Sequence, residues 1–295
     1  SKIASDSGFD EQKISPSQLL REGDRSQFLC SLFLPEPHRA AAIALHTFKL
    51  EIARVGRVVS DPLIGQLRLK WWYDAVKNLE NGKILDHPVV IAIDRVFQEY
   101  ELDPSVLLAL VEAYSDALVR KQPERLTGLF THLDRTLGDL NSLIVHVVAG
   151  GASNEAVNAA YHVTRAWGIS QLLLSLPKSE SKSGIYIPKE ILSRESVTFT
   201  DLMELNQAGH MPDSIIRVIR TVVEIAEEEL SKGRRLRSVI APPVRSALLI
   251  GILAGQDLAA IKMSGFDPRR LRHGRLEPGP MTMVKLWWGA QRGRY

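Results

Sequence analysis

The sequence predicts an all-α protein, and three features carry this prediction. Apolar residues recur at every third or fourth position along most of the chain, which is the spacing of one helix face. Several of these segments begin with a capping residue followed directly by proline, a typical helix start. We find no strand-type alternation and no internal repeat, and no linker divides the 295 residues. We therefore expect a single-domain helical bundle with its own core.

The first elements follow from these signals in order. Residues 1–15 are polar and expected to be mobile, so the helical domain should span residues 16–290. A first helix is expected over 16–34 and two long ones over 44–59 and 62–79, with Asp61 as N-cap and Pro62 as the first helical residue. The apolar face of the helix over 44–59 comprises Phe48, Ile52, Val55 and Val59. The expected face of the helix over 62–79 comprises Ile64, Leu67, Trp71, Ala75 and Leu79.

The later elements are indicated by caps, periodicity and glycines. His87-Pro88 and Asp103-Pro104 mark two helix starts, and Gly150-Gly151 ends a long helix. A polar loop over 177–187 precedes a short helix at Pro188. The helices expected after residue 79 are 88–100, 106–120, 125–149, 155–176, 188–192, 213–230, 242–258 and 281–290.

Composition and charge limit the functional classes. The single cysteine, Cys30, excludes a disulfide framework, and its apolar neighbours predict a buried side chain. No apolar run approaches the roughly 20 residues that cross a bilayer. Residues 217–295 hold 15 Lys and Arg against 7 Asp and Glu, a net charge of +8, whereas the rest of the chain, with 22 against 27, carries −5. A basic half can meet an anionic surface, but no motif favours nucleic acid as a partner.

Other chemistry-bearing residues fit structural roles better than catalytic ones. There is no Gly-rich phosphate loop, no Gly-x-Ser-x-Gly and no His-Glu-x-x-His. The acidic run Glu227–Glu229 is expected to face solvent. His46, His146 and His162 are expected to be hydrogen-bonded core residues, because no second ligand lies at metal-binding spacing.

Two segments resemble the squalene/phytoene synthase family. That family carries Phe-x-Arg-x-x-Asp-Asp-x-x-Asp on one helix and tryptophan on the next; here Phe48 and Trp71-Trp72 correspond. Its second signature, a glutamine- and leucine-rich helix followed by Tyr-Leu-Pro, resembles Gln171-Leu-Leu-Leu and Tyr186-Ile-Pro. The resemblance implies an all-α isoprenoid-synthase-like bundle with a central cavity.

The aspartates of both family motifs are replaced in this chain. Those of the first motif fall on Ala53, Arg54 and Arg57, which leaves Glu51 as the carboxylate of the segment. Counted without a gap from the glutamine, those of the second motif fall on Lys178 and Lys182. In the family each acidic motif supplies oxygen ligands to Mg²⁺, and a cation in its place should repel the metal. We therefore expect no cofactor and a protein that is not an enzyme.

These departures resemble a narrower branch of the family, the assembly factors of respiratory complex I. Residues 25–35, Phe48-x-x-Glu51-x-Ala53 and the basic end, 285–295, carry this resemblance. It implies a non-catalytic factor whose partners are complex I subunits or other assembly proteins. It also implies a location in the bacterial cytoplasm or the mitochondrial matrix, peripheral on the inner membrane.

Two alternative functions stay open. One is metal-independent binding of an isoprenoid diphosphate or an anionic lipid, in which fixed cations replace Mg²⁺. The candidate ligand-binding residues are Glu51, Arg54, Arg57, Lys178, Lys182 and Tyr186. The cations among them could instead pair with Glu51 or other acids, or reach solvent. The second alternative is a prenyltransferase that condenses prenyl diphosphates with Mg²⁺ on displaced carboxylates.

The C-terminal helix is a candidate membrane contact. Its tryptophans lie beside cations, as in helices that bind at a membrane interface. The residues concerned are Lys285, Trp287, Trp288 and Arg292. Docking of the tryptophans on the core is the alternative.

Overall fold

The structure is a computed structural model that describes residues 14–59, 61–119, 121–151, 153–177, 186–205, 209–271 and 278–295. Most of these residues are helical and none lies in a strand, so the all-α prediction is confirmed. The helices are α1 (Pro16–Gly23), α2 (Arg25–Ser31), α3 (His38–Val58), α4 (Pro62–Glu80), α5 (Pro88–Tyr100), α6 (Ser105–Leu118), α7 (Leu126–Leu133), the π-helix η1 (Asp134–Gly138), α8 (Asp139–Ala149), α9 (Asn154–Ser175), α10 (Lys189–Arg194), α11 (Phe199–Met203), α12 (Asp213–Arg235), α13 (Pro242–Arg245), α14 (Ile250–Met263) and α15 (Pro280–Arg292). Among the described residues, the short 3₁₀ segments are η3 (Leu236–Val239), η4 (Ser246–Leu248) and η5 (Pro268–Arg270).

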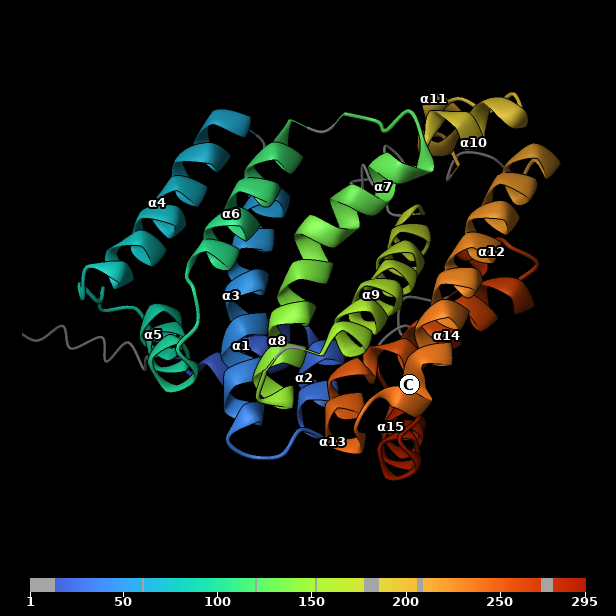
Figure 1. Cartoon of the computed structure of the whole chain (residues 1–295). Helices are drawn as coiled ribbons and strands as arrows, with labels where there is room; N and C mark the ends of the chain where they lie inside the picture. The colour runs from blue at the N-terminus through green and yellow to red at the C-terminus, as the bar shows by residue number, and fades with distance from the viewer. Residues whose placement is uncertain are drawn as a thin grey trace, which may run out of the picture.

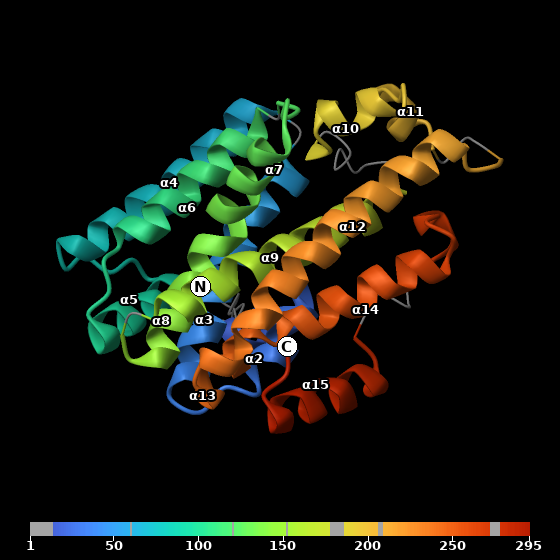
Figure 2. The same cartoon turned by 45° about the vertical axis from the view of Figure 1, so that its right-hand side comes forward.

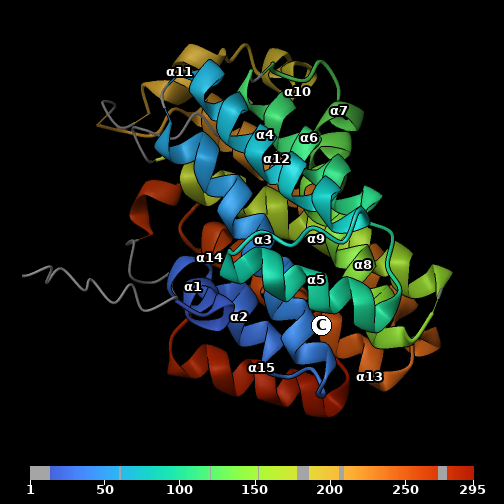
Figure 3. The same ribbon diagram turned by 90° about the vertical axis from the view of Figure 1, so that its left-hand side faces the viewer.

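Two groups of helices meet along α8 and α9 (Figure 1). In the first group α3 packs against α4, α5, α6 and α8. In the second group α9 packs against α12 and α14, and α8 contacts both α3 and α9. The short helices α10 and α11 lie at one end of the bundle, whereas α13 and α15 lie at the other (Figures 1 and 3).

Local sequence explains where the helices begin and end. The Asp61 carboxylate accepts a hydrogen bond from the Leu63 amide at 2.8 Å, as expected of the N-cap of α4. Gly150 ends α8 with a φ of 65°, a left-handed conformation that suits glycine. On α9, a Cβ at Gly168 would come within 2.5 Å of Leu133 Cδ2, so glycine lets α9 approach α7 closely.

Two predicted helices are interrupted in the structure. The segment 16–34 forms α1 and α2, because Asp24 leaves the helical conformation and caps α2 through its carboxylate. The segment 125–149 runs through α7 and α8, but with the π-helix η1 between them. A π-turn inserts one residue into the helix and shifts the faces that follow it.

The predicted face of α4 is wrong in register. Ile64, Leu67 and Trp71 are 48%, 63% and 43% exposed, whereas Ala75 and Leu79 are buried as expected. The helix instead buries Leu69, Trp72 and Val76 along with Gly65. The cause is a close approach of α6: a Cβ at Gly65 would lie 2.8 Å from Leu118 Cδ1. Periodicity alone did not reveal that a glycine faces the neighbouring helix.

In the described part of the chain, no single helix combines the length and the apolar character needed to cross a bilayer. The helical segments Pro242–Leu248 and Ile250–Met263 are long and apolar enough when taken together, but they are bent by 43° at the break between them.

Candidate functional site

The residues at the first altered motif lie on the second half of α3. Glu51 is half-buried, whereas Arg54 and Arg57 are exposed. An ion pair joins Arg54 Nη1 to Glu51 Oε1 at 3.1 Å. The structure therefore shows, for Arg54, the pairing with Glu51 that the sequence left open. Arg57 forms no ion pair with another described residue.

An aromatic cluster fixes this half of α3 against α4 and α5. Phe48 meets Trp72 edge-on with ring centroids 5.5 Å apart, and Trp72 meets His87 at 5.1 Å. His87 Nδ1 accepts a hydrogen bond from the Val89 amide at 3.2 Å, which requires that nitrogen to be unprotonated. Burial lowers the pKa of His87, although the Glu51 carboxylate opposes this shift. The Glu51 carboxylate is therefore close enough to influence the protonation of His87.

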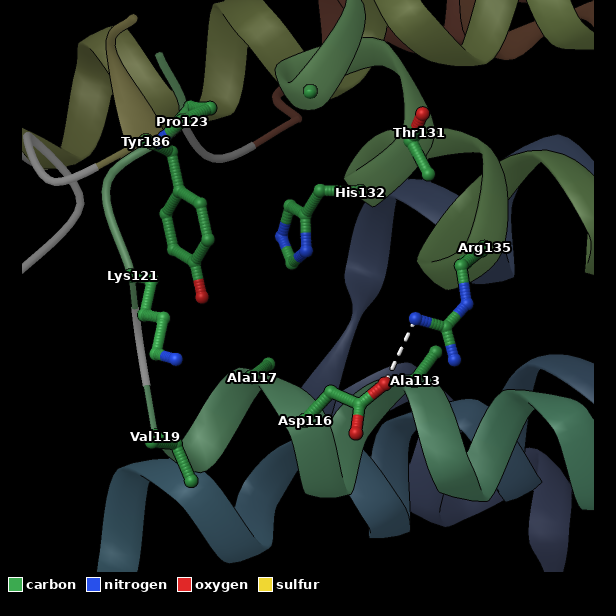
Figure 4. Close-up of a pocket in the computed structure, with 11 residues that line it drawn as sticks. Ala113, Asp116, Ala117, Val119, Lys121, Pro123, Thr131, His132, Arg135 and Tyr186 are labelled. Carbon is green, nitrogen blue, oxygen red and sulfur yellow. Dashed lines mark hydrogen bonds and ion pairs between the residues drawn. The ribbon is translucent and has the colours of Figure 1, made fainter. Parts of the chain in front are cut away.

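Tyr186 lines a pocket of about 410 Å³ between α6 and α7 (Figure 4). Its ring stacks on that of His132, with centroids 4.2 Å apart and an angle of 11° between the planes. Across the pocket, Arg135 Nη1 lies 2.8 Å from Asp116 Oδ2. None of the α3 candidates lines this pocket, so the structure does not bring Tyr186 and the α3 cations into one pocket.

The segment after Tyr186 is anchored to the connection between α6 and α7. The Lys189 amide donates to the Pro123 carbonyl at 2.9 Å, and Gln122 Nε2 donates to the Ile187 carbonyl at 2.9 Å. These bonds join parts of the chain more than 60 residues apart. They explain how the element that resembles Tyr-Leu-Pro places Tyr186 beside α7.

The end of α9 meets a carboxylate that the sequence analysis missed. Gln171 Nε2 donates to Asp257 Oδ2 at 2.9 Å, and the Ser170 hydroxyl lies 3.4 Å from the same oxygen. Burial raises the pKa of Asp257 to about 7, although both hydrogen bonds oppose the rise. A single acid within the apolar run Ile250–Met263 was the available signal.

Acidic side chains are not grouped around a metal position in the described part of the chain. The described residues contain no group of three or more His, Cys, Asp or Glu side chains arranged to hold a metal ion. Mg²⁺ demands near-ideal octahedral oxygen coordination, and Glu51 on α3 is bound by Arg54. Lys178 and Lys182 lie outside the described residues.

The four candidate membrane residues lie together on α15. Trp287 and Trp288 are each about half exposed. The Arg292 guanidinium lies over the Trp288 ring, 4.1 Å from its centroid. Lys285 and Trp288 line a groove between α14 and α15. The structure thus places this set at the end of the bundle opposite α10 and α11 (Figure 3).

The prediction that Glu229 faces solvent is wrong, because this residue belongs to a buried network of charged side chains. This residue is 2% exposed and accepts hydrogen bonds from Arg165 at 3.2 Å and Lys232 at 2.8 Å, and it lies 2.8 Å from His162 Nδ1. Burial alone would raise the pKa of Glu229, but these partners outweigh it and lower the pKa to about 2. Arg165 also holds Asp134 of the π-helix through two bonds of 2.8 and 2.7 Å.

The predictions for the three histidines have different outcomes. His162 is hydrogen-bonded as expected, whereas His146 is exposed. His46 is buried, but its Nδ1 has no hydrogen-bond partner in the described part of the chain. Burial lowers the pKa of His46 to about 3, so the ring is neutral.

Comparison with known proteins decides the family. A family model described as squalene/phytoene synthase matches residues 20–277. The chain belongs to the squalene/phytoene synthase family. Among solved structures of similar fold, a dehydrosqualene synthase in complex with ligand has a TM-score of 0.76 at 16% identity and covers 94% of both chains. The squalene synthase HpnC from Alicyclobacillus acidocaldarius has a TM-score of 0.72 at 20% identity and covers 86% of this chain and 94% of its own. The expected isoprenoid-synthase fold is confirmed.

Related proteins from rat and human carry the same name. The relative from Rattus norvegicus, named NADH dehydrogenase (ubiquinone) complex I, assembly factor 6, is 26% identical over 264 residues, which are 90% of this chain and 78% of that protein. The Homo sapiens protein of the same name is 26% identical and covers 85% of this chain and 74% of its own. The resemblance to the assembly-factor branch of the family is therefore confirmed.

Proposed function

We propose that this protein is a non-catalytic factor in the assembly of respiratory complex I, built on the squalene/phytoene synthase fold. The observation that carries the proposal is its similarity, over most of both chains, to relatives named complex I assembly factor 6. A shared fold alone would not carry it, because this fold also belongs to synthases. The proposed location is the bacterial cytoplasm or mitochondrial matrix, at the inner membrane surface.

The chemistry of α3 supports a role without catalysis. Arg54 and Arg57 stand where the family has metal-binding aspartates, and Arg54 occupies the remaining carboxylate of the segment. A fixed cation at this position repels a divalent ion. The partners of such a factor are complex I subunits or other assembly proteins.

The outer face of α4 is the surface that we propose for such a protein partner. Leu63, Ile64, Leu67 and Trp71 form an exposed apolar stripe on this helix. Contiguous apolar surface of this kind marks interaction sites in soluble proteins. Apolar anchors at the centre of an interface contribute most of its binding energy.

Deletion of the gene should reduce the amount of assembled complex I, measured on native gels with in-gel NADH oxidation. Wild-type protein should restore it, and Leu63→Glu/Leu67→Glu should not, because two carboxylates would enter the proposed interface. The matched control is Ile14→Glu/Ile84→Glu, which places the same charges on exposed apolar residues outside the stripe. Restoration by the α4 variant would reject the docking surface, and normal complex I after deletion would reject the assembly role.

A metal-independent anion binder is the second candidate function, favoured by the exposed Arg57 beside Arg54. We expect farnesyl diphosphate to bind equally with and without Mg²⁺ and to give no C30 product. Charge reversal in Arg54→Glu/Arg57→Glu should weaken that binding at least about tenfold, since two charge-assisted contacts are lost. Unchanged binding in this variant would remove the candidate function. Magnesium-dependent turnover would instead restore the synthase alternative.

A further inference from the structure

The groove between α14 and α15 is basic, and no Asp or Glu is among the described residues that line it. It has a volume of about 870 Å³ and is lined by residues of α12, α14, α15 and the segments that adjoin them. Figure 2 shows α15 running below α14 at the edge of the molecule. Its basic lining residues are Arg234, Arg237, Lys285 and Arg294.

These cations have no Asp or Glu side chain as a partner among the described residues. None of the four forms an ion pair with an Asp or Glu side chain of the described residues, whereas Lys262 on α14 pairs with Glu227 at 2.9 Å. Arg234 donates to the main-chain oxygen of Tyr295 at 2.6 Å. Burial and then the charge of Arg237 lower the pKa of Arg234. Crowded cations of this kind favour a bound anion.

The same groove carries apolar side chains that face water. Met263 is 89% exposed, Val284 56% and Trp288 48%. Met281 and Trp287, which are also exposed, extend this surface along α15. The combination of exposed tryptophan, aliphatic side chains and cations is typical of helices that lie in a membrane interface. An inorganic anion would satisfy the cations but leave the apolar side chains in water.

The attachment of α15 keeps this surface in place. Leu286 is fully buried, and a Cβ at Gly289 would come within 2.2 Å of Ile252 Cδ1, so the inner side of α15 packs tightly on α14. Gln256 Nε2 lines the groove as a buried donor without a hydrogen-bond partner in the described part of the chain. A buried donor of this kind is expected to meet an acceptor when a ligand binds.

We propose that the α14–α15 groove binds the phosphate headgroup of an anionic phospholipid in a bilayer, while the exposed side of α15 enters the membrane interface. The four cations recognise the phosphate, and Gln256 donates to an ester or phosphate oxygen. Met263, Val284 and Trp288 contact the first carbons of the acyl chains. This inference stands on the groove itself and does not depend on the proposed role in complex I assembly.

Vesicle co-sedimentation of the full chain tests the proposal. We expect binding to vesicles of phosphatidylcholine mixed with phosphatidylglycerol, and little binding to phosphatidylcholine alone. The variant Arg237→Glu/Lys285→Glu should bind these vesicles at least about tenfold more weakly, because each basic residue near an anionic membrane surface adds to the affinity. Met263→Ser/Val284→Ser keeps the charges and should also weaken binding, with loss of Trp quenching by brominated acyl chains.

The matched control is Arg95→Glu/Arg194→Glu, which makes the same change in net charge on the exposed surfaces of α5 and α10. Retained binding in this control supports the groove. An equal loss in the control and the groove variant would show attraction by net charge and overturn the proposal. So would a stabilisation by soluble glycerol phosphate without vesicle binding, because it would indicate a site for free anions.

Discussion

Replacing Arg165 with leucine should lower the free energy of unfolding by about 3 kcal/mol, because Asp134 loses its ion-pair partner and the buried Glu229 loses one of its three partners. Arg165 holds Asp134 through two hydrogen bonds and Glu229 through a third, and its guanidinium also lies 4.6 Å from the centre of the Phe130 ring. Glu229 is 2% exposed, so water does not replace Arg165, and the carboxylate keeps only Lys232 and His162 as partners. Thermal unfolding should begin about 10 °C lower in the variant.

The matched control is Arg217→Leu. Arg217 pairs with Glu195 at 2.5 Å, but its side chain is 54% exposed, and an exposed pair contributes about 0–1 kcal/mol. The change should therefore leave the melting temperature within about 2–4 °C of the wild-type value. Equal losses in both variants would show that burial of the Arg165 network does not determine its contribution.

The sequence predicted which segments are helical, but it did not always predict which face of a helix is buried. The face of α3 was found because Phe48 and Ile52 belong to a long apolar period, and both are buried. On α4, Leu67 belongs to an apolar pattern that is as regular as the one on α3, and yet its side chain is exposed. The difference comes from Gly65, where α6 approaches closely. A pattern of apolar residues states which faces could be buried, whereas the neighbouring helix decides which one is.

The polar contacts were less predictable, because they join residues far apart in the chain. Asp257 meets Gln171 across 86 positions, and Glu229 meets Arg165 across 64. For Glu229 a signal existed, since it continues the helical spacing of the buried residues Val222, Ala226 and Gly233. The partner itself could not be read from any local pattern.

The two proposed interaction surfaces lie far apart on the bundle. The exposed stripe of α4 and the basic groove beside α15 are on different sides, and all three ribbon views agree on the separation of these helices (Figures 1, 2 and 3). A protein that binds a membrane through α15 would therefore leave α4 free for a protein partner. This arrangement suits a factor that acts on membrane-bound intermediates.

Replacing Asp257 with asparagine should stabilise the protein at pH 8 and have little effect at pH 4. Burial raises the pKa of Asp257 from 3.8 to about 7, so the folded state keeps a proton that the unfolded state has already lost. Stability should therefore fall as the pH rises from about 4 to about 7, and stay lower above that. A pKa shift of about 3 units corresponds to about 4 kcal/mol of stability. We expect about half of this value, since the carboxyl group is partly accessible to water.

Asparagine removes this loss and still accepts the hydrogen bond from Gln171. Thermal unfolding at both pH values measures the effect, which we expect to reach about 4–8 °C at pH 8. The matched control is Glu224→Gln on α12, an exposed acid that forms no ion pair in the described part of the chain. A stabilisation that is the same at pH 4 and pH 8 would contradict the prediction, because only ionisation of Asp257 in the folded state makes the effect depend on pH.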